Sequence, residues 1–297
     1  MHQSPISEAL AKLQNPSHNH LSGKPLDALE ALFDLSRSSI GGFREFLEEL
    51  LHFSFWKSQD FPSNPYPALC LGLASLIDSH AGSIGVPEPA YHSRKHFQDV
   101  CLALTALLAQ PKESTQPSDL HDPWAISQDD VWLLLFCAVA HDFGHDGSIN
   151  KTPSQLEKSS IEKTRVFLSE GSHESDFVAA LGDKIEPMIL ATDPSNLRGL
   201  LSAFSGCQMS PSKKDCMCML LVEADLLAST LPKRGLLLGQ QLAREWETTN
   251  PKAAFAVATP QGRINFLEYI RFASPYAIML GMEDIRQESI NQLKASL

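Results

Sequence analysis

Residues Val131 to Asn150 read VWLLLFCAVAHDFGHDGSIN, and they decide how the rest of the sequence is interpreted. Val131 to Ala140 carry no charge, which predicts a buried core helix. At its C-terminal end this helix delivers His141, Asp142 and His145. Burying imidazole and carboxylate groups in an apolar environment costs free energy unless a strong partner compensates for the lost hydration. We therefore expect a pair of metal ions at the end of this helix.

Further ligands for such a site occur elsewhere in the chain. His92 and His96 are four residues apart, so on a helix they project from one face. One could bind a metal while the other stands over the substrate, although a surface coincidence gives the same spacing. Asp225 lies in the apolar segment CMLLVEADLLAS without an adjacent Lys or Arg. Burial would raise the pKa of this carboxyl unless a cation holds it ionised.

The donor set limits the identity of the ions. Two histidines and two aspartates suit Zn²⁺, Mn²⁺ or Fe²⁺ with open positions for water. If Asp142 bridges, a second and harder ion such as Mg²⁺ or Mn²⁺ can be held largely through waters. A capping aspartate beside a hydrogen-bonded core histidine is the alternative interpretation of His141 and Asp142.

Composition narrows the class of protein. The 297 residues are 43% hydrophobic, which is typical of a globular chain with a large core. The net charge of −11 excludes an extended nucleic-acid surface, while a small anionic substrate stays compatible with it. No apolar run reaches the roughly 18 residues of a membrane span, and the N-terminus lacks a signal sequence. We expect a cytoplasmic protein with no membrane partner and with reduced cysteines.

The periodicity of apolar residues predicts an all-α fold with one domain over residues 25–297, preceded by a polar leader at residues 1–24. No sustained alternation of apolar and polar residues indicates a strand. Ser127 or Asp129 can cap the central helix. The other main helices are expected at Ala68–Ser79, Tyr91–Leu108, Ser154–Leu168, Ser175–Ala191, Asp215–Thr230 and Phe266–Met282.

Several motifs together resemble one family. YHSRKHFQDV at Tyr91–Val100 is similar to the Y-H-N-x-x-H-x-x-D-V signature of class I cyclic nucleotide phosphodiesterase catalytic domains, within the HD-domain phosphohydrolases. HDFGHDGSIN at His141–Asn150 resembles their H-D-x-x-H-P-G-x-x-N. The likeness continues in the family's order through SSIEKTRVFL, ILATDPSNL, VEADLLASTLP and FLEYIRFASP, and so covers about Tyr91 to Pro275.

The resemblance implies a role for each matching residue. His92 would be the general acid that protonates the leaving O3′. Ligands of the first metal would be His96, His141, Asp142 and Asp225, with Asp142 also touching the second. Around the second ion and its waters, the resemblance implies His145, Glu162, Thr192 and Asp193. Phe266 would clamp the base, with Ile270 as an apolar neighbour.

The chain departs from the family where the base would be read. If Phe266 is aligned on the clamp, Arg263 stands where the family has an invariant glutamine, and Gln261 is two residues early. An amide donates and accepts hydrogen bonds, whereas a guanidinium only donates. Either a local shift puts Gln261 in the pocket, or the base is read differently. Asp146 also replaces the usual proline.

The activity implied is hydrolysis of cAMP or cGMP to the nucleoside 5′-monophosphate by a metal-bridging hydroxide. Two alternatives stay open. The same metal site could act on another phosphodiester or a phosphomonoester, or the domain could be an inactive scaffold that binds a nucleotide or a protein. The sequence does not indicate a homodimer.

Overall fold

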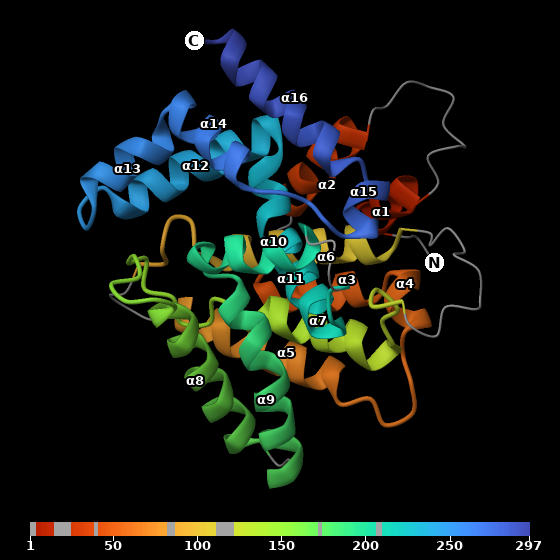
Figure 1. Cartoon of the computed structure of the whole chain (residues 1–297). Coiled ribbons are helices and arrows are strands. Elements are labelled where there is room, and N and C mark those ends of the chain that lie inside the picture. Colours follow the sequence, from red (N-terminus) through yellow and green to blue (C-terminus); the bar gives the residue numbers. More distant parts are fainter. Residues whose placement is uncertain are drawn as a thin grey trace.

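A computed structural model describes residues 4–14, 25–38, 41–81, 87–110, 122–171, 174–205 and 210–297. Within these ranges every regular element is a helix, which agrees with the predicted all-α fold (Figure 1). The elements are α1 Pro5–Gln14, α2 Pro25–Ser38, α3 Phe43–Leu51, α4 Ser54–Ser58, α5 Tyr66–Ala81, α6 Arg94–Leu108, α7 Gln128–Ala140, α8 Gln155–Glu170, α9 Ser175–Ala191, the 3₁₀ turn η2 Pro194–Asn196, α10 Leu197–Ser205, α11 Lys213–Thr230, α12 Pro232–Trp246, α13 Pro251–Ala258, α14 Pro260–Tyr269, α15 Pro275–Met279 and α16 Met282–Ala295.

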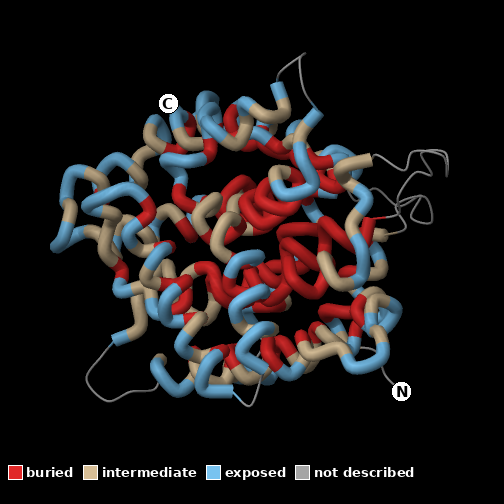
Figure 2. The backbone as a smooth tube through the Cα atoms, turned by 60° about the horizontal axis from the view of Figure 1, so that its bottom comes forward, coloured by how far each residue is buried: buried red, intermediate tan, exposed pale blue. Residues whose placement is uncertain are grey.

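Helix α7 is the predicted core helix. Ser127 begins it with a capping box, in which the Ser127 hydroxyl accepts from the Asp130 N–H and the Asp130 carboxylate accepts from the Ser127 N–H. All ten residues from Val131 to Ala140 are buried, and the helix ends at Ala140 with His141 as its C-cap. Figure 2 shows that buried residues gather in the middle of the molecule, with exposed residues around them. The helix that supplies part of the site is therefore held on all sides.

Two other helices complete the framework of the site. Helices α6 and α11 pack against each other and both contact α7. On one side the α8–α9 pair projects away from this centre, and α12, α13 and α14 lie together on another side (Figure 1). A cavity in this arrangement can be lined by the central helices and by both flanking groups.

A buried ion pair fixes α12 against α6. The Arg234 guanidinium donates to Asp99 through Nε at 3.1 Å and through Nη2, and both side chains are buried. Glu30 of α2 accepts from the backbone N–H groups of Lys233 and Arg234 at the start of α12. These contacts set the position of α12, whose last turn reaches the site described below.

The predicted polar leader at residues 1–24 contains a helix. Residues 15–24 and 1–3 lie outside the described residues, but α1 spans Pro5–Gln14 and packs against α2. Ile6, Leu10 and Leu13 are buried in the main core. Their spacing of four and three residues makes one apolar face, which outweighs the polar composition of the segment.

The predicted helix Phe266–Met282 is wrong. Helix α14 ends at Tyr269, α15 begins at Pro275 and α16 begins after Gly281, whose φ is +73°. In the gap, buried Glu223 accepts from the backbone N–H groups of Ala273 and Ser274, so these groups are satisfied without a helix. Helices α12 and α13, in the stretch before it, have no counterpart among the predicted helices.

No helix in the described part of the chain is both long and apolar enough to span a bilayer. The five described cysteines, Cys70, Cys101, Cys137, Cys216 and Cys218, are buried and free, as expected for reduced thiols. Cys207 lies outside the described residues.

Helix α1 should contribute to stability. We expect Leu10→Ala to lower the free energy of unfolding by about 2–5 kcal/mol, because it leaves a cavity in the core. Lys12→Ala, on the exposed face of the same helix, should change it by less than about 0.5 kcal/mol. Urea unfolding measures both values, and an equally small effect of the two substitutions would mean that α1 does not dock.

Candidate metal and active site

Two buried imidazoles meet between α6 and α7. His96 lies in the first turn of α6, His141 caps the C-terminus of α7, and their Nε2 atoms are 3.2 Å apart. The His141 Nδ1 lies 2.9 Å from the Ala138 carbonyl oxygen, which can only accept, so Nδ1 carries the proton. In neutral His141 the Nε2 lone pair therefore points at His96. Such a hydrogen bond on the far nitrogen is the usual way to orient a metal-binding imidazole.

Two carboxylates enter the same space. The Asp142 Oδ2 is 3.2 Å from the Nε2 atoms of both His96 and His141. The Asp225 Oδ1, from α11, is 3.2 Å from His96 Nε2 and 3.8 Å from His141 Nε2. The structure thus brings together all four predicted ligands of the first metal. Asp142 lies beyond the last turn of α7, so its side chain does not have to follow the helical spacing of about 100° per residue. It can therefore reach the same space as His141.

This donor set fits a divalent cation. Burial opposes the charge on His96, but hydrogen bonds with Asp142 and Asp225 outweigh burial and raise the pKa of His96 to about 10. Burial also acts to raise the pKa of Asp142, yet His141 and His96 hold that pKa well below its usual range. The site therefore binds positive charge even without a metal. Two nitrogen and two oxygen ligands are typical of Zn²⁺, Mn²⁺ or Fe²⁺.

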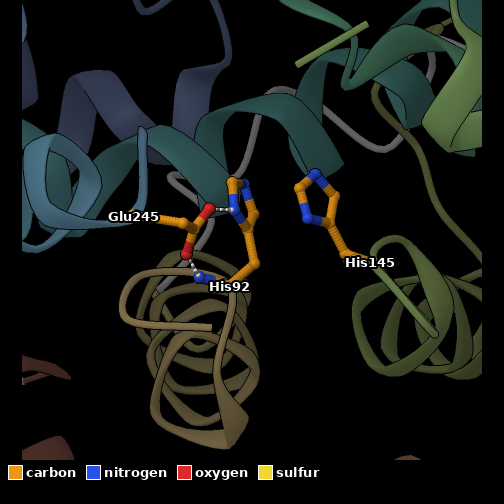
Figure 3. A group of neighbouring side chains, drawn as sticks. All are labelled: His92, His145 and Glu245. Carbon is orange, nitrogen blue, oxygen red and sulfur yellow. Dashed lines mark hydrogen bonds and ion pairs between the residues drawn. The ribbon is translucent and has the colours of Figure 1, made fainter. Parts of the chain in front are cut away.

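His92 is held beside this cluster by a residue that the sequence analysis misses, Glu245 of α12. The Glu245 Oε1 is 2.5 Å from His92 Nδ1, and its Oε2 accepts from the backbone N–H groups of Tyr91 and His92 at 2.7 and 3.0 Å. Figure 3 shows both oxygens engaged on the His92 side. The other ring nitrogen, Nε2, lies 4.0 Å from Asp142 Oδ2. Glu245 thus directs the free nitrogen of His92 toward the cluster.

His145 lies against the ring of His92. The ring centroids are 3.6 Å apart and the planes are nearly parallel, at 20° (Figure 3). Burial and the neighbouring His92 lower the pKa of His145 to about 4, and its Nδ1 accepts from the Gly147 N–H. Although His92, His145 and Glu245 are close enough to hold an ion, stacked rings direct their lone pairs into parallel planes. We therefore assign this group to positioning His92.

A cavity of about 390 Å³ opens over the candidate metal ligands. His92, His96, Asp142 and Asp225 line it together with predicted Thr192 and Asp193. Asp193 also accepts from the backbone N–H groups of Ser154 and Ser195, which ties α8 to η2. The remaining wall is largely apolar and includes Leu238, Leu242, Val257 and Phe266. This size and lining suit a small organic anion.

The structure separates the residues predicted to read the base. Phe266 lines the cavity, whereas Ile270 is buried and is not among the residues lining it. Gln261 is exposed and donates to Asn265, so no local shift brings it into the cavity. Arg263 lines the cavity and is buried, with hydrogen bonds to backbone carbonyls. Arg263, and not Gln261, is therefore the polar side chain of α14 at this wall.

The structure does not bring Glu162 to the site. Glu162 is exposed on α8, whereas Glu157 lines the cavity and accepts from the Asn150 amide at 2.9 Å. The buried positions of α8 are Glu157, Ser160, Ile161, Thr164 and Leu168, which follow the helical period. The helical spacing of the apolar residues in α8 could have identified Glu157 from the sequence, because it places Glu157 on the buried face and Glu162 on the exposed one.

Comparisons with known proteins agree with this architecture. No protein-family model matches the sequence, and no curated protein matches it. The phosphodiesterase domain of the rhodopsin phosphodiesterase of Salpingoeca rosetta superposes with a TM-score of 0.58 and 16% identity, over 84% of this chain and 94% of that one. A second structure, the phosphodiesterase domain of the RhoPDE fusion protein of the same organism, superposes with a TM-score of 0.60 and 15% identity, over 97% of each chain.

LmjPDEB1, solved in complex with IBMX, gives a TM-score of 0.61 at 15% identity, over 99% of this chain and 98% of that one. At such identities the likeness concerns the fold. This chain therefore has the fold of phosphodiesterase catalytic domains.

Proposed function

We propose that the protein is a metal-dependent phosphodiesterase that hydrolyses a 3′,5′-cyclic nucleotide to the nucleoside 5′-monophosphate. The observation that carries the proposal is the meeting of His96, His141, Asp142 and Asp225 on the wall of a cavity that His92 also lines. The shared fold supports the reaction class. A catalytically inactive scaffold would not need two buried imidazoles with two half-buried carboxylates 3.2–3.8 Å from them.

The four residues His96, His141, Asp142 and Asp225 would hold one divalent ion directly. A second ion would be held by Asp142 and, through waters, by the nearby residues Asn150, Glu157 and Asp193. Bound ions would supply an acidified water and neutralise charge on the phosphoryl oxygens. The chain's own residues position the substrate between this charge and the apolar wall. Phe266 and Leu238 would enclose the base, which removes water from one side of it.

Proton transfer to the leaving group falls to His92. Glu245 holds Nδ1 as a donor, so the proton on Nε2 of the imidazolium faces the cavity, where O3′ would depart. Neutral His145 stacks on the ring and limits its rotation. General-acid catalysis of this kind contributes about 10²–10⁴-fold to a rate.

Removing the acid should separate chemistry from metal binding. We expect His92→Ala to retain stoichiometric metal, measured by mass spectrometry, and to lower kcat on cAMP and cGMP by about 10²–10⁴-fold. His52→Ala, which replaces an exposed histidine at the C-terminal end of α3, is the control. Unchanged turnover would remove His92 from this role. Turnover of only a chromogenic diester would favour another phosphodiester as substrate.

Glu245 should act through His92. We expect Glu245→Gln to lower kcat by about 10- to 100-fold with unchanged metal content, because the neutral amide that replaces the carboxylate holds His92 less strongly through Nδ1. Glu247→Gln, exposed two residues later, should leave kcat unchanged. Equal rates of the two variants would contradict the positioning role of Glu245.

Metal binding should compete with a proton on His96. Its pKa in the metal-free fold is raised from 6.5 to about 10, so the protonated ring stabilises the metal-free protein below pH 6.5, and this contribution is lost as pH rises through 10. We expect metal-free protein to take up Mn²⁺ with release of a proton at pH 7, and the apparent affinity to rise with pH up to 10. Calorimetry in buffers of different ionisation enthalpy counts the protons. No release would show that His96 is neutral before the metal arrives.

A further inference from the structure

The wall of the cavity that α12, α13 and α14 form, which we call the α12–α14 wall, is apolar where a ligand can touch it. The side chains that line the cavity from these helices are Leu238, Leu242, Trp246, Val257, Arg263 and Phe266, and glycines supply the other positions. Leu242, Val257 and Phe266 are only half-buried, so they keep apolar area for contact with a ligand. A flat and largely apolar group such as a purine suits this surface.

Arg263, the charged side chain of the α12–α14 wall, is bound to the protein's own backbone. Its Nη1 donates to the Gly235 carbonyl, and its Nη2 lies 3.3 Å from the Leu231 oxygen and 3.4 Å from the Ser229 oxygen. The side chain is buried, its Nε included. The hydrogen bonds of Arg263 are therefore made to the protein, and they join the first turn of α14 to the junction of α11 and α12.

The packing around this guanidinium agrees with a structural role. A Cβ at Gly235 would lie 2.2 Å from the Ser229 oxygen and 2.5 Å from Arg263 Nη2, so glycine is needed for α12 to approach this closely. At Gly262 a Cβ would lie 1.6 Å from the Ala256 oxygen, so α14 is in equally close contact with α13. Two glycines and one arginine thus hold the three helices together as a continuous wall.

Two further N–H-bearing side chains of this region, Trp246 and Gln261, direct these groups away from the cavity. Trp246 lines the cavity and is half-buried as a whole, but its Nε1 is buried, so the N–H is not part of the surface that a ligand meets. Gln261 is exposed and its amide donates to Asn265. Among the described residues, the α12–α14 wall therefore presents apolar surface to a base.

Two hydroxyl groups lie between this wall and the metal cluster. The Tyr91 hydroxyl and the Ser229 Oγ are 3.3 Å apart, and both residues line the cavity. The Tyr91 ring is 4.8 Å from the His96 ring, while the Ser229 carbonyl faces Arg263. A hydroxyl rotates, and it both donates and accepts hydrogen bonds. It can therefore match an amino group or an oxo group on a base.

Purine bases differ most at position 6. Guanine carries the acceptor O6 there, whereas adenine carries the N6 amino donor. A site that holds a fixed donor or acceptor against this position rejects the wrong base strongly, because a buried polar group is left unpaired. Apolar contact has no direction and depends on the area buried, which is similar for the two bases. Carbon atoms and rotatable hydroxyls thus give no basis for choosing between them.

We propose that the protein holds the base by apolar enclosure without reading position 6, so that cAMP and cGMP are hydrolysed with similar kcat/KM. This inference rests on the proposed function and adds its substrate class, namely 3′,5′-cyclic purine nucleotides irrespective of the group at position 6. Leu242 and Phe266 supply contact area for the base, and Arg263 holds the wall in place.

The substrate series that tests this inference is cAMP, cGMP and the 3′,5′-cyclic phosphate of 6-chloropurine riboside. The chloro compound differs from cAMP only at position 6, where chlorine cannot donate a hydrogen bond and is a poor acceptor. We expect the three kcat/KM values to agree within about fivefold, since an unpaired buried partner would cost at least about that factor. A larger difference between any two of them would overturn the inference.

Shortening the apolar wall should affect every base alike. We expect Leu242→Ala to lower kcat/KM by about threefold or more, and by the same factor for all three substrates, because it removes contact area. Leu236→Ala, at an exposed position of α12 that does not line the cavity, is the control and should keep the native values. Unequal falls among the substrates, or no fall for any, would overturn apolar enclosure.

Replacing Arg263 should affect stability and leave selectivity unchanged. We expect Arg263→Met to lower the melting temperature by about 2 °C or more, because three carbonyl groups lose a donor. Arg198→Met, at an exposed position of α10, is the control for this measurement. The ratio of kcat/KM for cAMP and cGMP should stay within about twofold of the native ratio, which a residue that reads the base would change. A changed ratio would overturn the assignment, and Leu242→Ala decides the matter if the Arg263 variant does not fold.

Binding measurements separate this inference from the proposed function. If none of the three cyclic nucleotides is hydrolysed, the proposed function fails, and the melting temperature of Mn²⁺-loaded protein with the 5′-monophosphates of adenosine, guanosine and 6-chloropurine riboside still tests the wall. We expect the three compounds to raise it equally at equal concentration. Unequal shifts, or no shift with any of them, would overturn the inference.

Discussion

The electrostatic requirement of four ionisable groups gathered beside an apolar core governs this structure. His96, His141, Asp142 and Asp225 come from three helices or their ends, and the imidazole Nε2 atoms lie 3.2–3.8 Å from the carboxylate oxygens. Burial acts to raise the pKa of Asp142, and the neighbouring imidazoles hold that pKa well below its usual range. In the metal-free fold a proton on His96 supplies part of the positive charge that the carboxylates require. A divalent ion would supply it more completely and would also link α6, α7 and α11.

His92 is held by a different set of contacts. Arg234 pairs with Asp99 of α6 and Glu245 with His92, which lies just before α6, so α12 is attached at two points along its length. The first contact is a buried ion pair, whose loss would leave a charge uncompensated. The second holds His92 beside the cluster, with its Nε2 4.0 Å from Asp142 Oδ2. Arg263 adds a third attachment by joining α14 to the beginning of α12. The wall that would meet the base and the group that would meet O3′ are consequently both attached to α12.

Local patterns explain which features the sequence predicts well. A short stretch of sequence is enough to predict helix α7, its Ser127 cap and the His-Asp pair, because local apolar periodicity and capping decide the structure there. Glu245 could not be singled out in this way, because its partner His92 is far away in the chain. It follows Leu238 and Leu242 on one face of α12, and only the folded structure shows that this face closes the cavity. The single helix predicted at Phe266–Met282 failed because Glu223, on another helix, satisfies the backbone at the break.

Contacts between His92 and Glu245 join residues 153 positions apart. A chain that emerges from the ribosome in order would thus present its histidines long before the carboxylate that orients one of them. Because distant contacts form late and slowly, the helices before α12 can collapse around α7 while His92 still lacks its partner. The contacts that hold His92 should therefore form only after α12 has been made, whereas His96, His141, Asp142 and Asp225 are all present once α11 is complete.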